Sequence, residues 1–298
     1  MARIQSVKFP ASRLAVAMVI LGTVGAFATE AGLDAITTVF WRCVFGTVFL
    51  AGWCVSRGYL AKATLVGHDL KVAGLGGICM VLSWSGFFAG FAMTSIATTT
   101  IVYHSQPFFV VLLGAVFFKE RITLDQALWM VSAFVGVGLA SGLVAPAGQI
   151  DPTWVLGIGL TLGAAWLYAC AAVLAKSLRR QRPEVTALCQ TTVGIALLAP
   201  FADLSVSLPV VTWGWLIGIG VLHTGIAYVL MYSAYPSLTT PVIGALTFIY
   251  PLVAIVIDWL IYDHPLGIAQ ALGVALIVVG TLGVKLGWRT VLTKSPQV

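Results

Sequence analysis

Residues 98–118 read TTTIVYHSQPFFVVLLGAVFF, an apolar run about as long as one membrane crossing, for which about 20 residues are needed. Five adjacent polar or helix-breaking residues interrupt this run: Tyr103, His104, Ser105, Gln106 and Pro107. Such residues are costly against lipid, so they usually face a cavity or a partner helix. The stretch therefore predicts the wall of a polar cavity inside a membrane-spanning helix.

A related interruption recurs 144 positions later, where FIYP at residues 248–251 lies inside a second apolar run. The same shift pairs Pro107 with Pro251, and it pairs QAL at 126–128 with QAL at 270–272. The boundaries of the apolar runs also stay aligned under this shift. We interpret the pattern as an internal duplication built around a central site.

The composition indicates a membrane protein. Apolar residues make up 60% of the chain and charged residues 9%, and the mean hydropathy is +1.02, whereas a soluble domain is nearer half apolar and a quarter charged. The net charge of +6 is distributed among short connections, so we expect no nucleic-acid partner. The five cysteines lack C-x-x-C spacing and lie within or at the ends of apolar runs. We expect them to be free thiols, and we expect no metal or cofactor.

Charged and Pro/Gly-rich breaks divide the chain into ten apolar segments. Their expected positions are 14–29, 35–55, 70–93, 98–118, 124–142, 153–176, 185–201, 210–234, 239–259 and 266–286. With this count, every Lys and Arg except Arg42 falls on connections at one side of the membrane. The positive-inside rule makes that side cytoplasmic. The sequence therefore predicts an all-α integral membrane protein of ten transmembrane helices with both termini in the cytoplasm, placed in a bacterial inner membrane.

The duplication divides these segments equally, five in residues 1–145 and five in residues 146–298. Because five is odd, the second repeat must enter the membrane in the opposite sense to the first. Inverted-topology repeats of this kind surround a site near the bilayer midplane and exchange conformations in alternating access. We expect the central site of this chain to lie between its two halves.

Two motifs resemble those of a known family. The run FFKERIT at 117–123, followed by Gln126, resembles the G-E-R-L-T…Q…G junction of the EamA-type transporters of the drug/metabolite transporter superfamily. Phe40-Trp41-Arg42 resembles their arginine-bearing second span. The second repeat departs from the pattern, with DHP at 263–265. The resemblance covers nearly the whole chain and implies a small-molecule carrier, often an exporter of amino acids or other metabolites.

Ionisable residues inside the spans are the first candidates for function. Arg42 has two readings: its guanidinium fork anchors a substrate carboxylate, or it forms a structural ion pair with Glu30 or Asp34. His104 lies near the middle of its span and can change charge near neutral pH. It is a candidate for proton coupling or substrate binding, with a neutral histidine bonded to a neighbouring helix as the alternative. Glu30 is a further coupling candidate.

The two matched prolines are candidate hinges. Each removes a backbone donor and clashes with the carbonyl four residues earlier, which predicts kinks at Pro107 and Pro251. Such kinks at equivalent places would let the two repeats open and close. A static bend that fills a packing gap is the alternative.

Aromatic residues far from the membrane faces suggest a binding pocket. The interfacial belt does not explain them, and buried tyrosine and tryptophan need hydrogen-bond partners. The candidates are Trp84, Tyr103, Trp166, Tyr168 and Tyr250, with neutral polar contacts from Gln106 and Gln190. The pocket would suit an aromatic or flat amphipathic solute, or a quaternary ammonium held by cation–π contacts; helix packing is the alternative.

The sequence thus predicts a secondary transporter that moves a small amino-acid-like or aromatic metabolite by alternating access, most often outward. An importer of a cationic or flat nutrient, such as choline or a vitamin, is the second hypothesis. An integral membrane enzyme acting on lipid is a third, disfavoured because no H-E-x-x-H motif or Ser/His/Asp set is visible in the spans. We expect a monomer or homodimer in the lipid bilayer.

Overall fold

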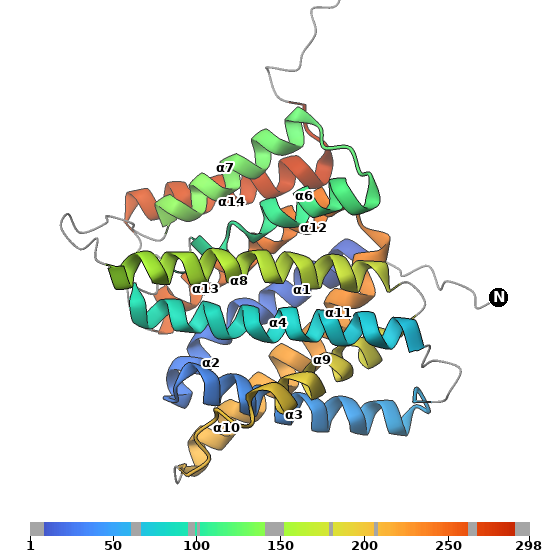
Figure 1. The fold of residues 1–298 in the computed structure, drawn as a ribbon. Coiled ribbons are helices and arrows are strands. Elements are labelled where there is room, and N and C mark those ends of the chain that lie inside the picture. Colours follow the sequence, from blue (N-terminus) through green and yellow to red (C-terminus); the bar gives the residue numbers. More distant parts are fainter. Residues whose placement is uncertain are drawn as a thin grey trace, which may run out of the picture.

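The computed structural model describes residues 9–60, 67–94, 99, 102–140, 152–178, 181–205, 208–261 and 267–289, and within them it is helical and has no strand (Figure 1). The first part of the chain forms α1 (Pro10–Gly22), α2 (Val24–Ala31), α3 (Ala35–Ser56), α4 (Gly67–Met93), α6 (Gln106–Phe118) and α7 (Leu124–Ala140). The second part forms α8 (Pro152–Ser177), α9 (Pro183–Leu198), α10 (Val210–Gly218), the π-helix η2 (Ile219–Ile226), α11 (Ala227–Ala234), the 3-10 turn η3 (Tyr235–Ser237), α12 (Thr240–Thr247), α13 (Ile249–Ile261) and α14 (Ile268–Leu286).

Six helical stretches of the described residues are long and apolar enough to cross a membrane. They are 10–31, 35–56, 67–90, 152–177, 210–237 and 240–261, and shorter apolar helices cover 106–118, 124–139, 183–198 and 271–286. All of them overlap segments predicted from hydropathy. Because the shorter helices do not reach spanning length, the number of ten crossings remains a prediction.

Local sequence explains where several helices begin and end. The side chain of Asp34 accepts a hydrogen bond of 3.0 Å from the backbone N–H of Thr37 and so caps α3, as expected for aspartate at a helix N-terminus. Gly32 ends α2 in a left-handed conformation with φ of 67°, which glycine adopts without steric cost. These two residues shape the tight connection between α2 and α3.

The prolines follow breaks in the helices at both predicted places. Residues 104 and 105 form a turn, and α6 restarts at Gln106 with Pro107 in its first turn. In the second repeat, Phe248 separates α12 from α13, whose first turn contains Pro251. Proline is tolerated in the first turn because its missing N–H would have no partner there. The predicted kinks are therefore short breaks in two matched helices; their use as hinges remains a prediction.

Equivalent helices of the two repeats pack against each other. The helix α7 contacts α14, which lies beside it at the top of Figure 1, and α3 contacts α9. A Cβ added at Gly136 would lie 2.6 Å from the carbonyl oxygen of Gly273, and one added at Gly280 would lie 2.6 Å from that of Trp129. Glycine therefore permits the close approach of α7 and α14, as small residues do in membrane helix pairs.

Three contacts show which helix ends lie together. Arg13 at the start of α1 donates to Ser233 at the end of α11. The indole N–H of Trp129, in the first half of α7, donates to the carbonyl of Trp288 just after α14. Lys176 near the end of α8 forms an ion pair with Glu120, which follows α6. In the topology predicted from the basic residues, all of these ends belong to the cytoplasmic face.

Candidate functional site

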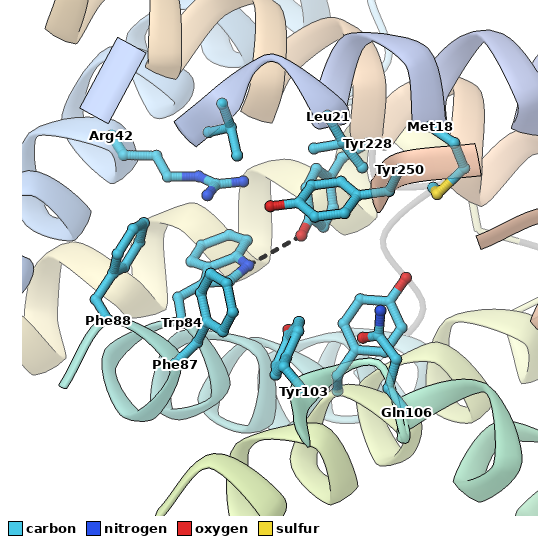
Figure 2. Close-up of a pocket in the computed structure, with 12 residues that line it drawn as sticks. Met18, Leu21, Arg42, Trp84, Phe87, Phe88, Tyr103, Gln106, Tyr228 and Tyr250 are labelled. Atoms are coloured by element: carbon cyan, nitrogen blue, oxygen red, sulfur yellow. Dashed lines mark hydrogen bonds between the residues drawn. The ribbon is translucent and has the colours of Figure 1, made fainter. Parts of the chain in front are cut away.

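A cavity lies between the two repeats, near the middle of the helices (Figure 2). The space inside it, counted together with its open mouth, is about 510 Å3. It is lined by Met18, Leu21, Val24, Arg42, Trp84, Phe87, Phe88, Tyr103, Gln106, Tyr168, Tyr228 and Tyr250. The lining is therefore aromatic and apolar, with a few polar groups from α3, α6, α8, α11 and α13.

Equivalent positions of the repeats face each other across this cavity. Trp84 and Tyr228 are 144 positions apart, and the indole N–H of Trp84 donates a 3.0 Å hydrogen bond to the hydroxyl of Tyr228. The lining also contains two further pairs with this separation, Val24 with Tyr168 and Gln106 with Tyr250. Residues related by an approximate two-fold axis meet only close to that axis. The cavity therefore lies on the pseudo-symmetry axis of the duplication.

Arg42 reaches the cavity from α3 and is 3% exposed. Its Nε donates to the hydroxyl of Thr224 at 2.7 Å, and its Nη2 donates to the carbonyl of His223 at 3.4 Å. The guanidinium carbon lies 3.9 Å from the centroid of the Trp84 ring and 5.7 Å from that of Tyr228. These contacts fix the guanidinium group at the wall of the cavity.

The π-helix η2 supplies both hydrogen-bond acceptors of Arg42. Its wider turns re-aim backbone and side chains relative to an α-helix, and π segments are frequent at functional sites. The neighbouring side chain of His223 bonds the hydroxyl of Thr23 at 2.8 Å. Gly220 lies against α3, since a Cβ there would be 2.4 Å from the Cβ of Phe45. Close contact with α3 thus brings the acceptors within reach of Arg42.

The structural ion pair considered for Arg42 is not formed within the described residues. The carboxylate of Glu120 pairs with Lys176 instead. Asp34 instead caps α3, and Glu30 lies exposed near the end of α2. Of the two readings of Arg42, the sequence-local ion pair is therefore wrong, and its charge is left facing the cavity.

The buried tyrosines have hydrogen-bond partners. Tyr103 shares a 3.1 Å hydrogen bond with the hydroxyl of Ser83, and Tyr168 shares one of 3.1 Å with Tyr235. The hydroxyl of Tyr250 points toward Arg42 in Figure 2. Trp84 is bonded to Tyr228, as described above. Four of the predicted aromatic residues thus line one cavity, with their polar atoms directed along its wall.

Gln106 lines the cavity from α6 and is 5% exposed. Its Oε1 is buried and has no hydrogen-bond partner among the described residues. A buried acceptor without a partner is costly, and one that faces a cavity is available to a ligand. The break before α6 places Gln106 here, because the helix restarts at this residue.

Other predicted residues lie outside the cavity lining. His104 is fully buried with its ring 5.4 Å from that of Tyr250. Gln190 is buried in α9 and accepts a hydrogen bond from Tyr232. Trp166 is 40% exposed and its ring lies 5.4 Å from that of Phe109. The structure therefore gathers six of the nine predicted binding residues at the cavity: Arg42, Trp84, Tyr103, Gln106, Tyr168 and Tyr250.

Several lining residues were not predicted from the sequence. Phe87, Phe88 and Tyr228 belong to aromatic stripes that helix packing also explains. Tyr228 was detectable in principle, because the 144-residue shift relates it to Trp84. Thr224 carried no such signal, since only the approach of α3 to η2 joins it to Arg42.

A second polar cluster joins the repeats at the predicted cytoplasmic ends of the helices. Lys176 pairs with Glu120 at 2.9 Å and also bonds the carbonyl of Leu238. Glu120 accepts from the backbone N–H of Thr240 at 2.6 Å and from its hydroxyl at 2.7 Å. Partial burial raises the pKa of Glu120, but the hydrogen bonds from Lys176 and Thr240 and the charge of Lys176 bring the pKa below its usual value. We call Glu120, Lys176 and Thr240 the clasp.

The long apolar helices and the axial cavity indicate a multi-pass membrane protein with a candidate small-molecule site. Comparison with known proteins gives the family. A model of the EamA-like transporter family matches residues 11–142 and again residues 155–286. The chain therefore belongs to the EamA-like transporter family, and its two matches correspond to the internal repeats.

Individual proteins agree with this assignment. The uncharacterized transporter YxxF of Bacillus subtilis (strain 168) is 30% identical over 276 residues, which cover 90% of this chain and 86% of that protein. An uncharacterized transporter of Archaeoglobus fulgidus is 24% identical over 283 residues, or 95% of this chain and 97% of that protein. A solved crystal structure matches with a TM-score of 0.80 at 18% identity, over 94% of this chain and 99% of that one. The last comparison supports the fold alone.

Proposed function

We propose that the protein is a secondary transporter that moves a small aromatic or amino-acid-like metabolite across the bacterial inner membrane by alternating access, in the outward direction. In this proposal ten spans form two inverted five-helix repeats, over residues 1–145 and 146–298, with both termini in the cytoplasm. The observation that carries the proposal is the cavity on the pseudo-symmetry axis, lined by matched residues such as Trp84 and Tyr228. A site on this axis can be exposed to either side by exchange of the two repeat conformations.

The clasp is the proposed cytoplasmic gate. Its ion pair and hydrogen bonds join the ends of α6 and α8 to the start of α12. The equivalent positions for the opposite face carry Gly32, Ile96 and His264, which cannot reproduce the ion pair. The sequence of the second face therefore lacks the ion pair of the clasp. Opening toward the cytoplasm requires the clasp to separate.

His104 and the helix breaks supply the proposed coupling and hinge elements. His104 is fully buried beside Tyr250, behind the cavity lining. A change in its charge would act on the cavity through Tyr103 and Tyr250, its aromatic neighbours. The breaks before Pro107 and Pro251 flank the same region. Proton coupling through His104 and hinge motion at the two prolines are parts of the proposal.

Site-directed labelling tests alternating access without knowledge of the substrate. We would replace the five cysteines by alanine and introduce Phe88→Cys, which lines the cavity. A membrane-impermeant thiol reagent is then added to one face or the other of oriented vesicles. Labelling from both faces is expected. The matched control Val16→Cys, on the exposed side of α1, should resist labelling because it faces lipid. Labelling of Phe88→Cys from one face only would reject alternating access.

A further inference from the structure

The charge of the cavity is the first observation. Arg42 is the only charged residue among the described residues that line it. None of the described carboxylates forms an ion pair with Arg42. Removing a charge from water is expensive unless an opposite charge and hydrogen bonds compensate it. The cavity thus presents a fixed positive charge that no described carboxylate pairs with; its contacts are the hydroxyl of Thr224, the carbonyl of His223 and the rings of Trp84 and Tyr228.

The guanidinium group retains capacity for a ligand. It carries five N–H donors, and the hydrogen bonds to Thr224 and His223 use two of them. The remaining edge faces the cavity in Figure 2, where the hydroxyl of Tyr250 points toward it. Planar, bidentate pairing makes guanidinium well suited to a carboxylate. A ligand carboxylate would therefore complete both the charge and the hydrogen bonding of Arg42.

Gln106 gives an independent indication of a ligand. Its buried Oε1 has no partner among the described residues, and its side chain lines the same cavity from α6. It would accept a hydrogen bond from an N–H or O–H group. The lining between Gln106 and Arg42 consists largely of rings, including Trp84, Phe87 and Tyr103. The chemistry of the lining therefore suits a flat body with an acid at one end and a donor elsewhere.

We propose that the cavity binds a small aromatic carboxylate with one net negative charge, and that Arg42 holds its carboxylate group. This inference rests on the proposed function and narrows it. Aromatic amines and quaternary ammonium ions are disfavoured, because no carboxylate lines the described cavity and Arg42 already covers a face of Trp84. A zwitterionic amino acid gains the bond to Arg42, but its ammonium group has only neutral partners.

The sign of the substrate charge bears on the direction of transport. The membrane potential is negative inside, so it acts on each translocated charge. An anion moving alone is driven outward by this potential. A carboxylate substrate therefore makes export favourable without a coupled proton, and uptake of the same anion would need an additional driving ion.

The test uses probes that share one ring system and differ in charge. Indole-3-acetate is the anion, indole-3-acetamide its neutral isostere, tryptophan the zwitterion and tryptamine the cation; benzoate serves as a smaller carboxylate. Binding is measured by the rise in Tm of the purified full-length protein, and transport is measured by flux into proteoliposomes. We expect indole-3-acetate and benzoate to bind. Indole-3-acetate should bind at least about tenfold more tightly than the other three indoles, because the loss of one charged contact of modest strength raises Kd about tenfold. A potential positive inside the vesicles should accelerate uptake of indole-3-acetate.

Variants of Arg42 test whether this residue recognises the charge of the ligand. Arg42→Gln should lower the affinity for indole-3-acetate by roughly 100-fold or more, as expected when a buried charged contact is lost. Arg42→Lys should retain part of the affinity, because an ammonium group keeps the charge and loses the fork. The matched control is Arg57→Gln, which removes an exposed arginine lying 5.1 Å from the Trp53 ring and outside the cavity. It should bind as the wild type does.

The outcomes separate this inference from the proposed function. Equal or tighter binding of tryptamine or tryptophan than of indole-3-acetate overturns the inference, as does unchanged affinity in Arg42→Gln. If no carboxylate binds while Phe88→Cys is still labelled from both faces, the inference fails and alternating access stands. If Phe88→Cys is labelled from one face only, the proposed function itself fails.

Discussion

Arg42 and Lys176 are both buried cations, each 3% exposed, but their charges are compensated by different groups. Lys176 has a carboxylate at 2.9 Å and lies 5.2 Å from the Phe118 ring. Arg42 has a closer aromatic ring, a hydroxyl and a carbonyl, and no carboxylate among the described residues. A charge compensated within the chain holds two elements together. A charge left without a counterion at a cavity is available to a ligand.

The two cations also differ in position relative to the repeats. Arg42 lies at the cavity on the pseudo-symmetry axis. Lys176 lies near the end of α8, where the proposed alternating access would separate the repeats. Replacement of Arg42 should therefore affect binding, whereas replacement of Lys176 should affect stability and gating.

The largest expected effect is that of Arg42→Gln on transport. Flux of an aromatic carboxylate should fall by roughly 100-fold, as expected for loss of a buried charged contact. The free energy of unfolding should change by less than about 1 kcal/mol, because the lost hydrogen bonds are offset by relief of an uncompensated charge. Proteoliposome flux and thermal unfolding measure the two quantities. Strong destabilisation with flux per folded molecule unchanged would make Arg42 a structural residue like Lys176.

The opposite pattern is expected for Lys176→Met. Removal of the cation leaves Glu120 partly buried without its counterion, which should lower the free energy of unfolding by about 2–3 kcal/mol, at or below the range for fully buried pairs. Binding of the carboxylate should be retained in the folded fraction. The double variant Lys176→Met/Glu120→Gln should be less destabilised than the sum of the single variants, because they act on one interaction. Additive effects would show that the clasp is not an energetic unit.

Thr224→Val tests the hydrogen bond between Thr224 and Arg42. The substitution removes the hydroxyl that accepts from Nε of Arg42, while leaving the charge in place. Affinity for the carboxylate should fall about tenfold, the equivalent of one hydrogen bond to a charged group. In the Arg42→Gln background it should have little further effect. Thr161→Val is the control, because its hydroxyl bonds a backbone carbonyl of its own helix; an equal loss there would indicate a general packing effect.

The smallest effect concerns pH and Glu120. Its pKa is lowered in the folded protein, so the clasp contributes stability above the ordinary carboxyl pKa of about 4.3. That contribution is lost as the pH falls through the lower, folded pKa. From pH 7 toward 3, Tm should therefore drop more in the wild type than in Glu120→Gln. Parallel curves would mean that protonation of Glu120 does not control the clasp.

Much of the architecture was predictable from the sequence. Runs of apolar residues separated by charged breaks set the positions of the helices, since lipid-exposed segments tolerate few charges. The shift that relates Pro107 to Pro251 also relates the two family matches, which start at residues 11 and 155. Of the interruption at residues 103–107, Tyr103 and Gln106 line the cavity; its role in binding remains a prediction. These features depend on local composition and on repetition along the chain.

The partners of individual side chains were decided by the tertiary structure. Sequence proximity suggested Glu30 or Asp34 for Arg42, but Asp34 caps its own helix and Arg42 turns toward η2. Trp166 lies as deep in its segment as Tyr168, yet the rotation of α8 exposes one and buries the other at the cavity. Hydropathy specifies that a helix crosses the membrane; which face meets the axis, and which charge keeps a counterion, depends on packing between helices distant in sequence.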